Sequence, residues 1–471
     1  MSNAASVIML PIYTRYLMPA DYGLLEMLQM LADVIAIIFG MRVNAGIFRL
    51  YHEKDDAEHQ RTVMSTSWIT DVAFHALAAL ALLAVSKPAA RLALGGDQYT
   101  SYVAIFAATL VTMATMAVPM AYLRALQRPW IFVSISISKL FLQLTLNIVF
   151  VVHLRWGPMG VIASTLITGV TIGGGISLWM FRRTGLRFSK NLSMRLVQFG
   201  FPMALASLCL FYTTYGDRFF IEHYWGLAEV GLYALAYRFA FALTSLVYGT
   251  FDQVWSTQAY VAYKQENRYE VFGRVFLMMM LGMLLIGTAL AVMCRDIIRV
   301  MSDPAFVGAW KAIPPLIAAY VFRAANDFCG FGLRLSEQTR HFFWASLISV
   351  GVISVGYIGL IPLWGGLGGG LATLAGMATE FWWVYRTSNK LVPLHLPWTK
   401  IIAASVLCVI AFGLSMFLPA ESLLTSIAYR SILLAALALA IYFSPIVGSA
   451  ERNACHTLLR DGLRRVGFAR A

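Results

Sequence analysis

The sequence predicts an all-α integral membrane protein with about fourteen transmembrane helices, built as two six-helix repeats plus two C-terminal helices. Apolar residues make up 59% of the 471 residues and charged residues only 13%, whereas soluble domains carry about 25% charged residues. Mean hydropathy is +0.71. Apolar stretches long enough to cross a bilayer recur along the whole chain, and the alternating segments typical of outer-membrane barrels are absent.

The first expected span is short, and we expect that the chain begins inside its first helix. It has no basic leading segment and no A-x-A cleavage site, so it does not resemble a signal peptide. The expected spans are 4–18, 22–50, 62–86, 99–126, 130–153, 158–181, 196–221, 228–257, 271–294, 310–335, 341–363, 366–386, 399–418 and 425–446.

An internal repeat organises these spans. Three pairs of motifs recur at offsets of 208 or 210 residues: 20–25 (ADYGLL) with 228–233 (AEVGLY), the WGxxG motifs that begin at Trp156 and Trp364, and the Leu-Arg dipeptides at 123 and 333. Six helices per copy is an even number, so the copies enter the membrane in the same orientation as parallel repeats. Repeats in an apolar chain indicate a transporter-like fold, with the substrate site between the copies.

The repeat and the composition give four segments. We predict an N-terminal lobe at 1–190 with a clipped first helix, a C-terminal lobe at 191–395, two extra helices at 396–450, and a basic tail at 451–471. The net charge of +13 is concentrated in this tail, in 182–195 and in other loops on one side. That bias predicts cytoplasmic termini and explains the charge without nucleic-acid binding.

Several function classes lack their sequence signals. No loop between spans is long enough to hold the external catalytic residues of a membrane polymerase or ligase. The chain has no G-x-x-x-x-G-K-[ST] phosphate loop, no H-E-x-x-H motif and no paired cysteine spacing. We therefore expect no enzymatic activity, no cofactor and no metal site.

Charged residues inside the expected spans are the candidate site, because burying a charge in a bilayer is costly. Five cations suit an anionic headgroup if they face the seam between the copies: Arg42, Lys139, Arg218, Arg238 and Arg323. The candidate ion-coupling carboxylates are Asp33, Asp71, Asp217 and Asp252.

Structural readings of these charges stay open. Arg323 and Asp327 lie one turn apart and can neutralise each other, and Asp71 and His75 form a similar pair or a proton relay. Arg218 and Arg238 can extend to the interface, as can Lys139. Asp217 is not expected to pair with Arg218, because neighbours on a helix point about 100° apart.

Three segments resemble a known family. Residues 11–23 (PIYTRYLMPADYG) and 217–233 (with DRFFI and EVGLY) resemble two helix junctions of Wzx-type oligosaccharide flippases, and 123–128 resembles the basic turn after the fourth helix. These flippases belong to the multidrug/oligosaccharidyl-lipid/polysaccharide exporter superfamily. The resemblance implies a V of two six-helix lobes, alternating access, and a cavity lined by helices 1, 2, 7 and 8, which favours Arg42, Arg218 and Arg238. Two extra C-terminal helices also occur in lipid II flippases of this superfamily.

The resemblance implies a function as well. It predicts a flippase in the bacterial inner membrane that moves an undecaprenyl pyrophosphate-linked oligosaccharide outward for O-antigen or exopolysaccharide synthesis. Membrane lipids and a polysaccharide polymerase or export machinery are the expected partners. The alternative is an ion-coupled drug or cation antiporter of the same superfamily, because the spans hold about as many carboxylates as cations.

Overall fold

The computed structural model describes residues 9, 11, 13–40, 46–338, 340–418 and 422–448. Within these residues the chain is helical and contains no strand, which confirms the all-α prediction. Ten of the described helical stretches are long and apolar enough to cross a membrane, or eleven if the bent pair Pro304–Lys311 and Ile313–Leu335 forms one span. The number fourteen stays a prediction, because most of the span expected at 4–18 lies outside the described residues.

The chain packs into two units: unit 1 is Met1–Ala234 with Met301–Phe306, and unit 2 is Leu235–Val300 with Val307–Ala471. This division follows packing, whereas the segments expected at 1–190, 191–395 and 396–450 follow the repeat and stay a prediction. The tail at 451–471 lies outside the described residues.

The described part of unit 1 contains nine α-helices and two π-helical segments, and it also holds the first part of α11. Their bounds are α2 (Pro19–Gly40), α3 (Ile47–Tyr51), α4 (Ala57–Ala84), α5 (Ser86–Leu94), α6 (Thr100–Ala125), α7 (Pro129–Asn147), η3 (Ile148–His153), α8 (Pro158–Thr168), η4 (Gly169–Gly173), α9 (Gly174–Thr184), α10 (Lys190–Tyr215) and α11 (Asp217–Leu243). Asp56 caps α4 by accepting hydrogen bonds from the backbone N–H groups of Glu58 and His59. These two donors hold the pKa of Asp56 below its usual range.

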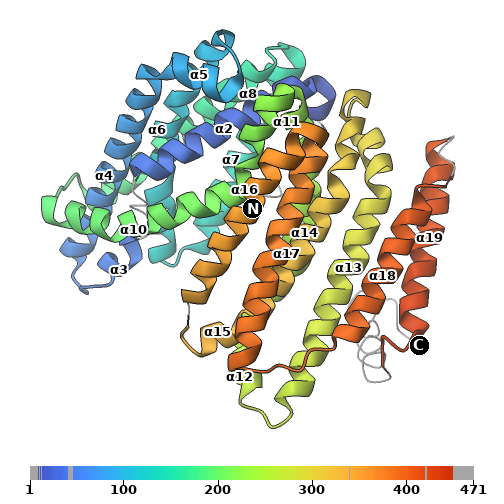
Figure 1. Cartoon of the computed structure of the whole chain (residues 1–471). Helices are drawn as coiled ribbons and strands as arrows, with labels where there is room; N and C mark the ends of the chain where they lie inside the picture. Colours follow the sequence, from blue (N-terminus) through green and yellow to red (C-terminus); the bar gives the residue numbers. More distant parts are fainter. Residues whose placement is uncertain are drawn as a thin grey trace, which may run out of the picture. The chain divides into compact units, whose positions relative to one another are not determined.

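Unit 2 continues α11 and contains η5 (Thr244–Tyr248), α12 (Gly249–Tyr263), α13 (Arg268–Met301), α14 (Ile313–Cys329), α15 (Phe331–Leu335), α16 (Arg340–Trp364), α17 (Gly366–Leu391), α18 (Trp398–Ser415) and α19 (Leu423–Phe443). The C-terminal helices α18 and α19 lie beside α13 (Figure 1), where Cys408 and Ile441 pack against Leu284 in one apolar cluster. The two helices outside the repeat are thus an integral part of unit 2.

The repeated motifs take the same backbone geometry in both copies. Gly157 and Gly365 precede α8 and α17 with φ of 57° and 55°, a left-handed region that favours glycine. Gln127 and Glu337 follow the two Leu-Arg dipeptides, and both have positive φ. In each copy the next residue donates to the leucine carbonyl, Arg128 N to Leu123 O at 3.1 Å and Gln338 N to Leu333 O at 3.0 Å. Both helices therefore end in the same Schellman motif.

A second pair of repeated glycines brings α2 against the part of α11 that follows its break at Gly226, inside unit 1. A Cβ atom on Gly23 would overlap the carbonyl oxygen of Leu227, and one on Gly231 would overlap the carbonyl oxygen of Pro19. Gly23 and Gly231 are separated by 208 positions, as are Pro19 and Leu227. The glycine of each copy therefore contacts the backbone of the other copy at an equivalent residue. Only glycine permits backbones to approach this closely.

Candidate functional site

Arg218 lies at the centre of a buried ion cluster in unit 1. Its side chain is 1% exposed, and its Nη1 lies 3.0 Å from Asp217 Oδ1. Its Nη2 lies 3.6 Å from Oε1 of Glu26 on α2. The Tyr233 hydroxyl donates to Asp217 Oδ2 at 2.6 Å, and the Tyr233 ring centroid lies 5.5 Å from the guanidinium carbon. The charge of Arg218 is thus balanced within the protein, where it ties α11 to α2.

The expectation that Asp217 and Arg218 do not pair is wrong. Helical side chains lean toward the N-terminus of their helix, and Arg218 Nη1 folds back to the Thr214 carbonyl at 3.2 Å. This folding brings the guanidinium group beside Asp217 and overcomes the angle between neighbouring residues. Sequence spacing alone underestimates the reach of a long arginine side chain.

The other residues of unit 1 that the sequence singled out are not members of the Arg218 cluster. His75 Nδ1 lies 2.8 Å from the backbone carbonyl oxygen of Asp71 and 3.5 Å from its Oδ1, so the two residues are in contact, as the spacing predicted. Asp33 accepts a hydrogen bond of 2.9 Å from Gln29 Nε2. Arg42 lies outside the described residues.

Lys139 lines a pocket of about 540 Å³ between α6, α7 and the α8–η4 region. Arg124 is the second basic residue at this pocket, and Gln143 and Thr165 add polar groups. Gln143 Nε2 donates to Ser164 Oγ at 2.8 Å, which fixes the orientation of its side chain. A second pocket of about 370 Å³ shares Arg124 and adds Arg128. None of the described residues that line either pocket carries a carboxylate, so we name them together the cationic pocket of unit 1.

A π-helical segment shapes one wall of this cationic pocket. Gly169 begins η4, lines the pocket and packs so tightly on Thr112 of α6 that a Cβ atom would overlap the threonine hydroxyl. Segments of this kind interrupt helices most often at functional sites. Gly169 thus lets η4 approach α6 closely at this wall of the pocket.

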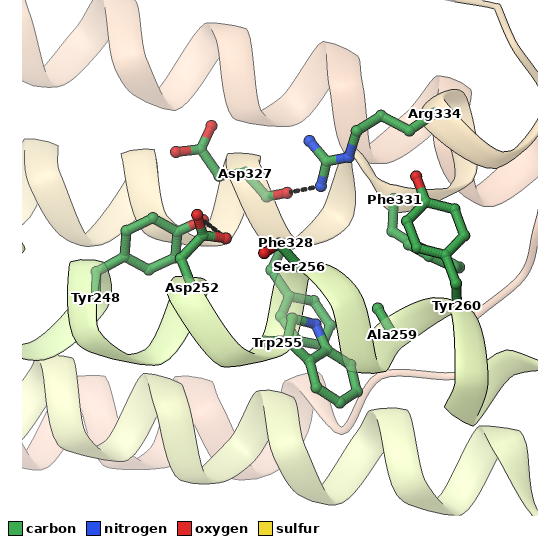
Figure 2. A pocket seen from close by; sticks show the side chains of 10 residues that line it. All are labelled: Tyr248, Asp252, Trp255, Ser256, Ala259, Tyr260, Asp327, Phe328, Phe331 and Arg334. Carbon is green, nitrogen blue, oxygen red and sulfur yellow. Dashed lines mark hydrogen bonds between the residues drawn. The ribbon is translucent and has the colours of Figure 1, made fainter. Parts of the chain in front are cut away.

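Unit 2 contains a pocket of about 340 Å³ in which acidic and aromatic side chains converge (Figure 2). It is lined by Tyr248, Asp252, Trp255, Ser256, Ala259, Tyr260, Asp327, Phe328, Phe331 and Arg334. Tyr248 ends the π-helical segment η5 and donates to Asp252 Oδ1 at 3.3 Å. Arg334 Nη2 donates to the backbone carbonyl of Asp327 at 2.6 Å (Figure 2). We name this the acidic pocket of unit 2.

Arg323 lies beside the acidic pocket and is balanced by carboxylates. Its Nε lies 3.5 Å from Asp327 Oδ2, which confirms the pair that the spacing predicted, and its Nη1 lies 3.9 Å from Glu380 Oε1. Arg238 is half-buried on α11 and is not among the described residues that line this pocket. Lys139, by contrast, lines a pocket whose described lining carries no carboxylate.

The two pockets use repeat-equivalent positions, which lie on α6 in the first copy and on α14 and α15 in the second. Ala117, Ala121 and Arg124 line the cationic pocket, and Asp327, Phe331 and Arg334 follow each of them at an offset of 210. The arginine is shared, while alanine at position 117 is replaced by a carboxylate at 327. The repeat thus supplies the same scaffold twice with opposite charge.

Unit 2 also carries an apolar groove of about 610 Å³ along α13, α14 and α18. Its lining is almost entirely apolar and includes Met283, Ile317, Val321, Trp398 and Val409. Thr288 and Ser405 contribute hydroxyl groups. Such a surface on membrane-spanning helices suits hydrocarbon.

One buried charge pair escaped the sequence analysis. Arg430 Nη1 on α19 lies 2.5 Å from Asp296 Oδ2 on α13, and both side chains are at most 4% exposed. Ser426 donates to the same carboxylate at 2.9 Å. The signal was present, because Arg430 falls inside the span expected at 425–446 and the rule for charged residues in spans applies to it.

Solved structures with this fold are transporters and flippases. The inward closed form of the lipid II flippase MurJ superposes with a TM-score of 0.74 at 14% identity, covering 94% of this chain and 97% of that chain. An inward-facing multidrug resistance MATE family transporter of the MOP superfamily gives 0.62 at 14% identity, with 83% and 95% covered. A Vibrio cholerae MATE transporter gives 0.52 at 15% identity, with 84% and 100% covered. At these identities the likeness shows the fold alone.

Family membership rests on the sequence. No curated protein matches this chain significantly. The family described as "Polysaccharide biosynthesis protein" matches residues 1–256, which is more than half of the 471 residues. The match includes α2, the glycine crossing, the Arg218 cluster, the cationic pocket and Asp252 of the acidic pocket. Together with the fold of the MOP superfamily, it confirms the resemblance found in the motifs: this chain belongs to the polysaccharide biosynthesis protein family.

Proposed function

We propose that this protein is a flippase that moves an undecaprenyl pyrophosphate-linked oligosaccharide from the cytoplasmic to the outer leaflet of the bacterial inner membrane. The cargo would serve surface polysaccharide synthesis, and a polymerase or export machinery would receive it. Both termini would be cytoplasmic. The observation that carries the proposal is the cationic pocket of unit 1, in a chain whose family and fold are those of polysaccharide biosynthesis transporters.

The pyrophosphate would bind in the cationic pocket. Lys139 offers a compact charge, and Arg124 and Arg128 offer planar guanidinium groups that match phosphate oxygens. The volume of about 540 Å³ lies within the range of about 300–1,000 Å³ that small-molecule sites occupy.

We assign the other four expected cations different roles. The charge of Arg218 is balanced by Asp217 and Glu26, and we assign it a structural role. Arg42 and Arg238 stay proposed contributors to headgroup binding. Arg323 would act through the carboxylates that it balances.

The prenyl tail and the coupling ion complete the proposal. The prenyl tail would stay in the hydrocarbon of the bilayer, where an apolar surface such as the groove of unit 2 suits it. Lobe movement would give alternating access without making or breaking a bond. Since Asp217 pairs with Arg218, our preferred carrier of a coupling proton or sodium ion is Asp33.

We expect Lys139→Ala to weaken the apparent affinity for the lipid-linked substrate by about 10- to 100-fold, because a hydrogen bond to a charged group contributes about 1.5–3 kcal/mol. The measurement is flipping of a fluorescent undecaprenyl pyrophosphate oligosaccharide in proteoliposomes. Lys139→Arg should retain most of the activity. The matched control is Lys190→Ala, an exposed lysine of unit 1 that lines neither part of the cationic pocket.

Flipping by Lys139→Ala at the wild-type rate across substrate concentrations would contradict the headgroup assignment. Proteoliposomes that instead exchange cationic drugs for protons or sodium, and leave the lipid-linked oligosaccharide in place, would identify a drug antiporter.

A further inference from the structure

The lining of the acidic pocket of unit 2 combines the chemical groups that a sugar ring requires. A pyranose has apolar C–H faces and a polar edge of hydroxyl groups. Aromatic side chains offer large apolar faces, while carboxylates accept and guanidinium groups donate hydrogen bonds. The pocket provides the exposed ring of Tyr260, carboxylates at Asp252 and Asp327, and a donor at Arg334.

These groups come from separate elements and point toward one space (Figure 2). Asp252 and Ser256 lie one turn apart on α12, and Asp327 faces them from α14. The Trp255 ring stacks on Phe328 at 5.5 Å between centroids with an interplanar angle of 3°, which fixes its plane. Tyr260 is 42% exposed and offers an open ring at the far end of the pocket (Figure 2).

The charges of the pocket are unequal. Two carboxylates, those of Asp252 and Asp327, line the pocket with one guanidinium group, that of Arg334. Arg334 is bonded to a backbone carbonyl, and Arg323 beside the pocket is held between Asp327 and Glu380, so neither side chain is directed at Asp252 by a described contact. The lining therefore carries a net negative charge, which repels an anionic ligand.

We propose that the acidic pocket binds the sugar part of the cargo and that Asp252 and Asp327 exclude glycans whose terminal residues carry carboxylates. This inference rests on the proposed flippase function and adds a substrate class to it: neutral or amino sugars rather than uronic or sialic acids. Other anionic groups, the pyrophosphate included, are repelled from this pocket by the same charges.

The volume of the acidic pocket limits how many sugar residues of the glycan it can bind. A pocket of about 340 Å³ lies at the small end of the usual range of about 300–1,000 Å³. It fits one or two sugar residues, so the selectivity applies to a terminal part of the oligosaccharide and tolerates variation elsewhere.

The test uses two matched probes and the full-length chain in lipid nanodiscs. The probes are hyaluronan tetrasaccharide, which contains glucuronic acid, and the same tetrasaccharide with its carboxylates reduced to alcohols. Affinities are measured by saturation-transfer NMR and titration. The wild-type protein should bind the reduced probe at least about tenfold more tightly than the acidic probe, because a like-charge contact carries a penalty.

Three variants locate the selectivity. Asp252→Asn and Asp327→Asn should each narrow the difference between the probes, since an amide keeps the hydrogen-bonding shape and removes the charge. Tyr260→Ala should weaken both probes equally and, being exposed, leave the fold intact. The matched control is Glu266→Gln, an exposed carboxylate of unit 2 that does not line the pocket.

Equal affinity of the wild type for the two probes, or no binding of the reduced probe at millimolar concentration, would overturn the inference. Tight binding of sodium ions without either glycan would reassign the pocket to a cation. Flipping of a neutral lipid-linked oligosaccharide, measured in parallel, separates the two proposals. If the protein flips the neutral oligosaccharide but binds both probes equally, the flippase function stands and the pocket assignment is wrong. If it distinguishes the probes but does not flip the oligosaccharide, the pocket binds sugar and the flippase function is wrong.

Discussion

Replacing Arg430 by alanine is expected to destabilise unit 2 by about 3–5 kcal/mol, because it leaves the Asp296 carboxylate buried without its charge partner. The two side chains join α19 to α13, and Ser426 alone cannot balance the charge. We expect α19 to detach first, since its other anchor is the apolar cluster around Leu437 and Ile441. The measurement is the midpoint of denaturant unfolding in detergent, with protease cleavage at the α18–α19 connection as a second readout.

A double variant separates charge from packing. Asp296→Leu combined with Arg430→Met replaces the ion pair by apolar groups of similar size, and it should recover most of the lost stability, because buried pairs often contribute little more than such replacements. The surface control is Arg340→Ala, an exposed arginine of unit 2, with an expected change below about 1 kcal/mol. An Arg430→Ala variant as stable as the wild type would contradict the buried pair.

Substituting valine for Gly231 is expected to destabilise unit 1 by about 3 kcal/mol or more and to abolish flipping, since overpacking against backbone has no flexible side chain to absorb it. A Cβ atom at this position overlaps the carbonyl oxygen of Pro19, so α2 must move away from α11. That movement would also separate Glu26 from Arg218, which lie 3.6 Å apart. Gly23→Val, the equivalent change in the other copy, should have a similar effect through Leu227.

The control for the glycine crossing is Gly174→Ala on α9. A Cβ atom there has no neighbour within 4 Å, so alanine should be neutral or stabilise its helix by about 0.5–1 kcal/mol. Thermal unfolding of the purified variants and flipping in proteoliposomes give the two readouts. Gly231→Val with wild-type stability would show that the helices do not cross at these glycines.

Much of the fold could be predicted from the sequence because its causes are local. A run of apolar residues marks a membrane helix wherever it packs, and the WGxxG and Leu-Arg motifs fix their turns through nearby hydrogen bonds. Gly157 and Gly365 indeed share their left-handed φ, and Gln127 and Glu337 occupy equivalent positions in the same motif. The pairs at one-turn spacing, Asp71 with His75 and Arg323 with Asp327, were also open to prediction for this reason.

The candidate site depended on tertiary structure, because the role of a charge is set by what faces it from another helix. The sequence by itself determined the membrane class, the repeat and the presence of cations within the spans. Only the packed helices decided that Glu26 balances Arg218, that Asp296 binds Arg430, and that Lys139 lines a pocket wall without a carboxylate. The sequence of a helix does not show which face packs against a neighbouring helix. The rotation of the helix decides which charges meet, and contacts such as that of Gly23 with Leu227 fix this rotation.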